Sequence, residues 1–230
     1  MSDRSSITHR AEPPTDRRRA RHDLKKARIL EEAWVLAARD GLAGISLRDL
    51  ADQVDLRQPS LYAYFDSKLA LYDEMFADGY RKLLARVAAT PPLPDPREEL
   101  VAFLELCVRF SSDEPVCHQL LFQRTIPGFE PSEASFAVAL EFYEVGSARI
   151  RAAGVTDDAD IDLFTAIVNG LAHQQVANDP GGDRWVRLAR RSVEMLLADV
   201  DRRSAKPARR ATPPAPTGGG ARRARGAKST

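Results

Sequence analysis

The segment 58–68 gathers polar and aromatic side chains whose chemistry suits a charged, flat, hydrogen-bonding partner. The amide of Gln58 can donate and accept hydrogen bonds at once, as the edge of adenine requires. The hydroxyls of Tyr62 and Tyr64 and the ammonium of Lys68 can donate to phosphate oxygens. If a helix presents these groups on one side, they form a surface suited to double-stranded DNA.

The spacing of apolar residues around this segment predicts two short helices joined by a tight turn. Each helix has one hydrophobic face, formed by Leu47, Leu50, Ala51 and Val54 in the first and by Leu61 and Phe65 in the second. The connection is only three or four residues long, so the two helices must cross steeply, which is the geometry of a DNA-binding helix-turn-helix. Ser46 is expected to cap the first helix, with Asp49 three residues later in a capping-box-like pair.

The wider sequence of residues 24–71 resembles the N-terminal domain of the tetracycline-repressor (TetR) family. The resemblance is carried by Ile29-Leu30-Glu31-Glu32-Ala33, Gly41, Gly44-Ile45-Ser46-Leu47-Arg48-Asp49-Leu50-Ala51, Gln58-Pro59-Ser60-Leu61-Tyr62-Ala63-Tyr64-Phe65 and Ser67-Lys68-Leu69-Ala70-Leu71. About 48 residues therefore follow a pattern in several parts, which is far more specific than a single short motif. The resemblance implies an all-helical homodimer that acts as a repressor-type regulator, with a ligand pocket and the dimer interface in its C-terminal domain.

The resemblance also assigns roles by position. Ser46 and Arg48 would approach the DNA backbone and a base edge. Gln58, Pro59, Ser60 and Tyr64 would enter the major groove, while Tyr62 and Lys68 would hold phosphates. The chain departs from the family pattern at Asp55, where glycine is usual in the turn, and at Tyr64, where histidine is common. Asp tolerates the left-handed conformation better than most residues, so we expect Asp55 to have a positive φ.

Helical periodicity continues through the rest of the chain, and no convincing run alternates with period two. We expect nine helices at about 24–39, 46–54, 58–65, 68–88, 96–111, 115–124, 132–153, 157–178 and 183–200. The fold class is therefore all-α: an N-terminal three-helix helix-turn-helix DNA-binding domain and a C-terminal six-helix domain for ligand binding and dimerisation. The expected divisions are a disordered basic arm (1–20), the DNA-binding domain (21–67), the C-terminal domain (68–201) and a disordered basic tail (202–230).

Charge is distributed unevenly along the 230 residues, although the formal net charge is only +1. Residues 1–28 hold nine Lys/Arg and four Asp/Glu, and residues 202–230 hold nine Lys/Arg and no acid. The segment between them is acidic, with 16 basic and 29 acidic residues. Basic tails on an acidic body suggest a polyanionic partner. The tails either add non-specific phosphate contacts or are solubilising disorder.

Aromatic and polar residues of the C-terminal helices are candidates for a pocket that holds a small-molecule effector. The effector-binding candidates are Phe110, Phe122, Tyr143, Asn169 and His173. Ordinary core packing is the alternative for any one of these aromatic residues. The last two helices are the candidate dimer interface, through Phe164, Val168, Leu171, Gln175, Val193 and Leu197. Packing within the subunit is the alternative for these residues.

Other classes of function find little support in the sequence. Cys107 and Cys117 are better explained as core fillers than as a redox pair. His118 next to Cys117 does not make a metal-ligand spacing, so we expect no metal and no cofactor. No nucleophile signature or phosphate-binding glycine loop indicates an enzyme. No stretch nears the roughly 18 apolar residues of a membrane span and no secretory signal is visible, so we expect a cytoplasmic protein.

The prediction is thus a ligand-responsive repressor that binds double-stranded DNA as a homodimer on a palindromic operator and responds to an unknown small-molecule effector. Two alternatives remain open. The first is a DNA-binding protein that needs no effector. The second is a helical small-molecule-binding module without a DNA function.

Overall fold

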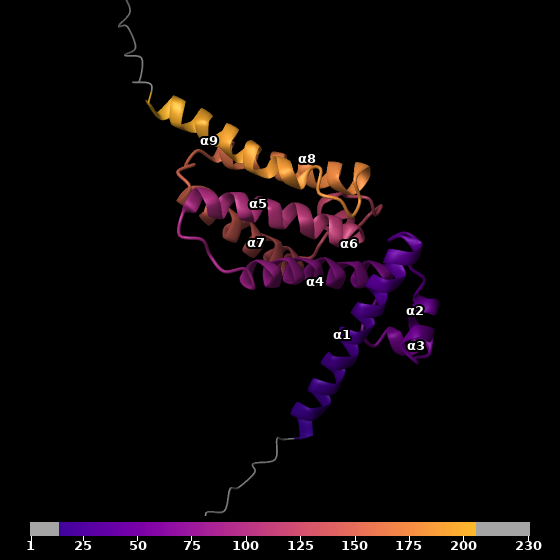
Figure 1. Cartoon of the computed structure of the whole chain (residues 1–230). Helices are drawn as coiled ribbons and strands as arrows, with labels where there is room; N and C mark the ends of the chain where they lie inside the picture. Colours follow the sequence, from indigo (N-terminus) through magenta and orange to yellow (C-terminus); the bar gives the residue numbers. More distant parts are fainter. Residues whose placement is uncertain (1–13, 206–230) are drawn as a thin grey trace, which may run out of the picture.

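The computed structural model describes residues 14–205, and all regular structure within this range is helical, as predicted (Figure 1). The helices are α1 (Pro14–Asp40), α2 (Leu47–Gln53), α3 (Gln58–Leu61), α4 (Lys68–Ala88), α5 (Pro96–Asp113), α6 (Pro115–Phe122), α7 (Glu133–Ala152), α8 (Asp158–Asn178), the short 3-10 helix η1 (Val186–Leu188) and α9 (Ala189–Ala205). None of the helices in this range is long and apolar enough to cross a membrane.

Local sequence signals explain most helix boundaries. Gly41 adopts a φ of +76° directly after α1, a conformation that glycine reaches without steric cost. The Ser67 hydroxyl accepts a hydrogen bond from the Ala70 N–H at the start of α4. Asp95 caps α5 in the same way, with Pro96 in the first helical position, where its missing N–H is not needed.

Both ends of the helical body extend further than the sequence analysis predicted. α1 begins at Pro14, so residues 14–20 are helical and were wrongly assigned to a disordered arm. The three arginines and the one alanine of this segment are good helix formers, although the segment has no apolar face. α9 continues to Ala205 because the Arg203 guanidinium binds both carboxylate oxygens of Asp160, at 2.6 and 2.7 Å. Residues 1–13 and 206–230 of the two predicted tails lie outside the described range.

Two further boundaries differ from the prediction. α3 ends at Leu61, and a turn continues to Phe65, whose N–H still donates to the Leu61 carbonyl. α9 begins at Ala189, after η1, and not near Asp183.

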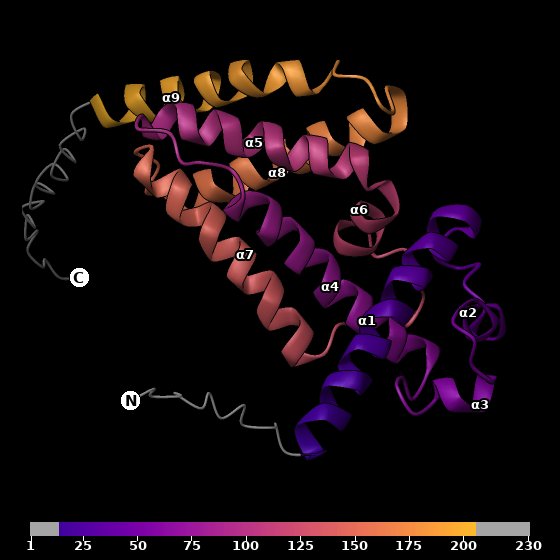
Figure 2. The same cartoon turned by 60° about the horizontal axis from the view of Figure 1, so that its bottom comes forward.

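Helices α1 to α3 form a small unit at one end of the molecule, and α4 runs from this unit into a bundle with α5 to α9 (Figures 1 and 2). The N-terminal end of α1 projects past α2 and α3, away from the bundle. α4 is thus the continuous connection between the small unit and the bundle.

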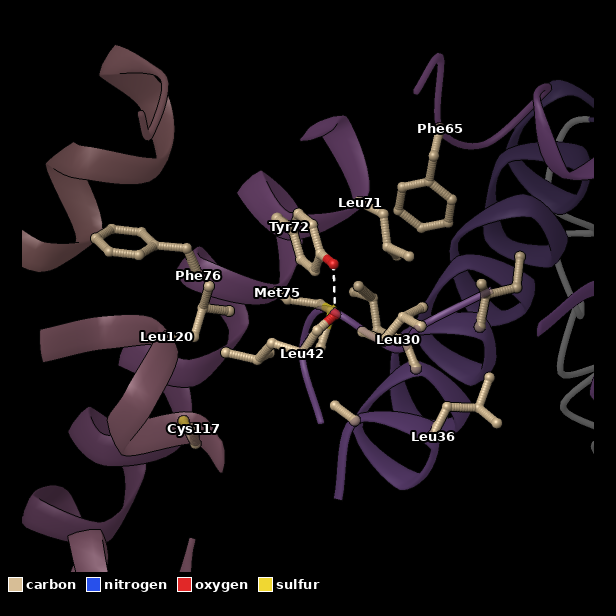
Figure 3. Packing of buried hydrophobic residues seen from close by; sticks show 14 of the residues in the cluster. Leu30, Leu36, Leu42, Phe65, Leu71, Tyr72, Met75, Phe76, Cys117 and Leu120 are labelled. Atoms are coloured by element: carbon tan, nitrogen blue, oxygen red, sulfur yellow. Dashed lines mark hydrogen bonds between the residues drawn. The ribbon is translucent and has the colours of Figure 1, made fainter. Parts of the chain in front are cut away.

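The core of the small unit extends without a break into the first half of α4 and onto α6. Leu36 and Leu42 pack in one cluster with Leu71 and Met75 of α4 and Cys117 of α6 (Figure 3). The Tyr72 hydroxyl donates a hydrogen bond to the carbonyl oxygen of Leu42 in this core. A second apolar cluster joins α5, α7, α8 and α9. Because one core joins α4 to the small unit, a shift of α4 would move that unit with it.

Candidate nucleic-acid interface and ligand cavity

The turn between α2 and α3 has the hydrogen bonds of a Schellman motif. The Leu56 N–H donates to the Ala51 carbonyl (2.9 Å), and the Asp55 N–H donates to the Asp52 carbonyl (3.3 Å). This motif needs a left-handed residue at its second-last position, and Asp55 has a φ of +54°. The predicted positive φ is therefore confirmed. Ser46 caps α2 by accepting a hydrogen bond from the Asp49 N–H at 3.3 Å, also as predicted.

The exposed side of α3 carries most of the predicted DNA-contacting residues. Gln58, Pro59 and Ser60 are exposed, and Tyr62 is 45% exposed. On the opposite side Leu61 and Phe65 are 1% and 3% exposed, and both belong to the apolar core that α1, α2 and α4 share. Arg48 on α2 is exposed as well, and Ser46 is partly buried. α3 thus presents a polar surface on one side and a buried apolar face on the other.

Two of the predicted residues already have partners within the protein. The Tyr64 ring stacks on His22 of α1, with ring centroids 4.7 Å apart and planes inclined by 19°. Lys68 donates to the Ala43 carbonyl at 2.9 Å and lies over the Tyr72 ring. A lysine ammonium has three donors, so two of the Lys68 donors remain for a phosphate.

A basic stripe on α1 adjoins this surface; its charge was predicted from the sequence as part of a basic N-terminal arm, but its helical conformation was not. We call Arg17, Arg18 and Arg21 the arginine extension; all three are exposed. Lys25, one turn further on, donates to the Val54 carbonyl at the end of α2 (2.5 Å). Arg28 lies 3.8 Å from the Asp55 carboxylate in the turn. The helical spacing of these basic residues was the available signal, but an expected helix start at Leu24 hid it.

A cavity of about 220 Å³ lies within the bundle, bounded by side chains from α4 to α8. Three of the five predicted effector-binding residues line it: Phe122, Tyr143 and Asn169. Phe110 and His173 are not among the lining residues. The Phe110 ring is buried beneath the Arg86 guanidinium. His173 is exposed, and its Nδ1 lies 3.2 Å from the Gln123 amide nitrogen.

Further lining residues were not predicted, because their position depends on how the helices pack. Aromatic walls come from Tyr80, Phe103 and Phe142, and hydroxyl groups from Ser111, Ser147 and Thr165. Burial, with a smaller contribution from Cys117, raises the pKa of Tyr80 to about 12. None of the lining side chains is an acid, a lysine, an arginine or a histidine.

His118 lies behind the cavity wall and is neutral at pH 7. Burial, together with the charge of His173, lowers the pKa of His118 to about 4. Its ring centroid lies 5.3 Å from that of Phe122, which lines the cavity. Its Nδ1 is buried without a hydrogen-bond partner in the described part of the chain.

The two cysteines are buried free thiols. Burial raises the pKa of both Cys107 and Cys117 to about 12. Reactive cysteines need a lowered pKa and solvent access, so this environment supports the interpretation as core fillers. Within residues 14–205 no group of three His, Cys, Asp or Glu side chains is arranged to hold a metal ion.

Four of the six residues predicted for a dimer interface are buried inside the subunit, so that part of the prediction is wrong. Phe164, Val193 and Leu197 are at most 4% exposed and pack in the second core cluster. Gln175 is fully buried, and its side-chain oxygen accepts hydrogen bonds from the Trp185 and Val186 N–H groups.

Val168 and Leu171 are partly buried. The exposed apolar surface of α8 and α9 lies elsewhere, at Leu163 (49% exposed) and Met195 (63%).

Known proteins resemble this chain in sequence and in fold. Residues 29–75 match the family model described as bacterial regulatory proteins, tetR family. The chain is 26% identical to the HTH-type transcriptional repressor KstR of Rhodococcus jostii (strain RHA1) over 193 residues, which cover 78% of this chain and 85% of that repressor.

Among solved structures, the fold resembles the TetR family transcriptional regulator PfmR from Thermus thermophilus, with a TM-score of 0.54 and 25% identity over 74% of this chain and 97% of that chain. It also resembles the transcriptional regulator FadR from Bacillus subtilis in complex with stearoyl-CoA, with a TM-score of 0.57 and 13% identity over 74% and 96% of the two chains.

Proposed function

Because the chain belongs to the tetR family of bacterial regulatory proteins, we propose that it is a ligand-responsive transcriptional repressor that binds a palindromic operator as a homodimer. The observation that carries the proposal is the exposed polar side of α3 on a helix-turn-helix within the segment that matches the family. Two such units would occupy successive major grooves, about 34–36 Å apart.

Each DNA-contacting residue has a chemical role in this proposal. Gln58 pairs with an adenine edge, while Pro59 and Ser60 contact neighbouring bases or a thymine methyl. Tyr64 lies beside them at the edge of the major groove, and its ring is held in place by stacking on His22.

Phosphates on either side of the groove bind Tyr62 and Lys68. Arg48 reaches a base edge or the backbone from α2. Ser46 acts mainly as the cap that fixes the start of α2.

The dimer interface that we propose uses the exposed sides of α8 and α9. Leu163, Ala166 and Gly170 follow helical spacing along α8 and are all exposed, with Ile167 partly exposed between them. Apart from the adjacent residues and the backbone of α8 itself, no atom lies within 4 Å of the position that a Cβ on Gly170 would take, so another helix can approach there closely. Met195 supplies the largest exposed apolar side chain on α9. Met195→Glu should convert the dimer to a monomer in analytical ultracentrifugation, whereas Met195→Leu should not.

Effector binding in the cavity would act through α4, which contributes Tyr80 to the cavity wall and Leu71, Tyr72 and Met75 to the core of the DNA-binding unit. The effector must bind more tightly to the state in which the spacing of the two units does not match the operator, because only differential affinity shifts the equilibrium.

The test begins by selecting operator DNA from random duplexes with the wild-type chain. Binding of each variant to the selected DNA is then measured by fluorescence anisotropy. Gln58→Ala and Tyr62→Phe should each weaken DNA binding about tenfold or more, because the first removes hydrogen bonds to a base and the second a hydrogen bond to a phosphate. Tyr143→Phe is the matched control for Tyr62→Phe, because Tyr143 is 44% exposed but lies on α7. Failure to enrich any sequence, or wild-type affinity in both α3 variants, would contradict the proposal.

A further inference from the structure

We propose that the cavity bounded by α4 to α8 takes an uncharged, mainly apolar molecule that carries one hydrogen-bonding group, received inside the cavity by the hydroxyl of Ser147. The inference rests on the proposed function, because it names the chemistry of the effector. It is carried by the Ser147 hydroxyl, the uncharged lining and the size of the cavity.

The Ser147 side chain is a buried polar group that has no partner within the described residues. The residue is 1% exposed and lines the cavity. Its Oγ makes no hydrogen bond to any other group in the described part of the chain. Buried polar groups in proteins are almost always paired, by protein, water or ligand.

The other serine and the threonine in the wall show how Ser147 differs. Ser111 donates to the Cys107 carbonyl and Thr165 to the Ile161 carbonyl, each at 3.0 Å, one turn back along its own helix. Such back-bonding is the usual choice of a serine or threonine within a helix. Because Ser147 does not make this bond, its donor and acceptor are both available to a molecule in the cavity.

The lining leaves no partner for an ion. Nearby cations are already engaged outside the cavity: Arg149 pairs with Glu99 (2.9 Å) and Arg86 with Asp113 (2.6 Å). Tyr80 and Cys107, with pKa values of about 12, stay neutral. A carboxylate or ammonium inside the cavity would be a buried charge without a counter-ion, which is strongly unfavourable.

The volume and the opening of the cavity set the size of the molecule. An engineered apolar cavity of about 150 Å³ in another protein holds benzene. By proportion, the cavity of about 220 Å³ holds roughly nine non-hydrogen atoms. The exposed lining residues Tyr143 and Thr165 and the partly exposed Asn169 come from α7 and α8, so the cavity opens between these helices and a longer molecule can extend there.

The test uses four probes of matched size: 1-octanol, octane, octanoate and octylammonium. Binding to the full chain is measured by isothermal titration calorimetry at pH 7, without DNA. We expect 1-octanol to bind best, and both ions to bind at least about tenfold more weakly because their charge has no partner. Equal or tighter binding of octanoate or octylammonium would overturn the uncharged class. Absence of binding by 1-octanol and octane would overturn the proposal as a whole.

Ser147→Ala tests the hydrogen bond directly. The substitution should weaken the binding of 1-octanol about fivefold, which corresponds to the loss of one net hydrogen bond. The affinity for octane should not change. Ser111→Ala is the matched control: it removes a buried hydroxyl from the same wall, but one that already donates to a carbonyl. Ser147→Ala is expected to fold, since it removes an unpaired polar group.

An equal effect of Ser147→Ala on 1-octanol and octane, or an effect no larger than that of Ser111→Ala, would overturn the role of Ser147. DNA binding by the same preparations, measured separately, judges the proposed function independently.

Discussion

Replacing the arginine extension, Arg17, Arg18 and Arg21, by glutamine should make operator binding much less sensitive to salt. Glutamine forms helices nearly as well as arginine, so the substitution removes charge and leaves α1 intact. Arg18 lies one helical turn, about 6 Å, before His22, which stacks on Tyr64 beside α3. The N-terminal end of α1, which carries the extension, projects past α3 (Figure 2), so we expect these arginines to reach phosphates that flank the half-site.

The magnitude follows from counterion release. Each neutralised phosphate contributes about −0.9 to the slope of log affinity against log salt concentration. Lys25 and Arg28 already face Val54 and Asp55, so three arginines per subunit are counted. If all six arginines of the dimer contact phosphates, the glutamine substitutions should reduce the magnitude of the salt slope by about 5. If only four do so, the reduction should be about 3.6. Between about 50 and 200 mM salt, a difference of about 5 in slope corresponds to a change in affinity of roughly a thousandfold.

The assay is fluorescence anisotropy over this salt range, with the selected operator on a long and on a trimmed duplex. Trimming the flanks should reduce the slope of the wild type but not that of the variant. The matched control replaces Arg81, Arg109 and Arg124 by glutamine, three exposed arginines of the bundle that carry the same charge. A slope within about one of the wild type, or an equal change in the control, would refute a role for the extension.

Three further predictions concern stability, measured by urea unfolding. Asp55→Gly should stabilise the chain by about 1 kcal/mol, because glycine removes most of the cost of the left-handed turn residue; a loss of stability would contradict this account. Gly79→Ala should destabilise by about 1–3 kcal/mol, since its Cβ would lie 2.8 Å from the Cys117 Sγ, and Cys117→Ala should relieve that loss if the contact causes it. His118 has a folded pKa of about 4, below its unfolded value of 6.5. The unfolded state therefore takes up a proton first as pH falls between 6.5 and 4, and about 2 kcal/mol should be lost from pH 7 to pH 5. His118→Leu should lack this part of the pH dependence, and an unchanged pH profile in that variant would argue against it.

The sequence predicted elements whose signals are local. Asp95-Pro96 and Gly41 mark helix ends through backbone conformations that their own residues favour. The end of α9 was missed because it depends on Arg203 reaching Asp160, 43 residues away. The start of α1 was missed because residues 14–20 lack the apolar periodicity on which the prediction relied.

The dimer and cavity predictions were limited by a different property of the sequence. α8 has apolar residues on most of its circumference, so periodicity alone cannot say which side faces α5 and α9. Phe164 and Gln175 face the subunit's own core, whereas Leu163 faces outward. Likewise Phe103 and Phe110 lie two turns apart on α5, and only Phe103 reaches the cavity. Which of two equivalent residues meets a cavity is decided by where neighbouring helices cross.

The position of α4 places a physical constraint on how such a regulator would switch. Tyr80 lines the cavity. Two turns earlier on the same helix, the Tyr72 hydroxyl donates a hydrogen bond to the Leu42 carbonyl just after α1. The side chains around Tyr72 and Met75 are closely packed, so this end of α4 cannot move without carrying α1 to α3 with it. A molecule that displaces Tyr80 therefore acts on the whole DNA-binding unit as a rigid body. Because coupling between two binding sites is reciprocal, operator DNA must weaken binding in the cavity by the same factor by which the effector weakens binding of DNA.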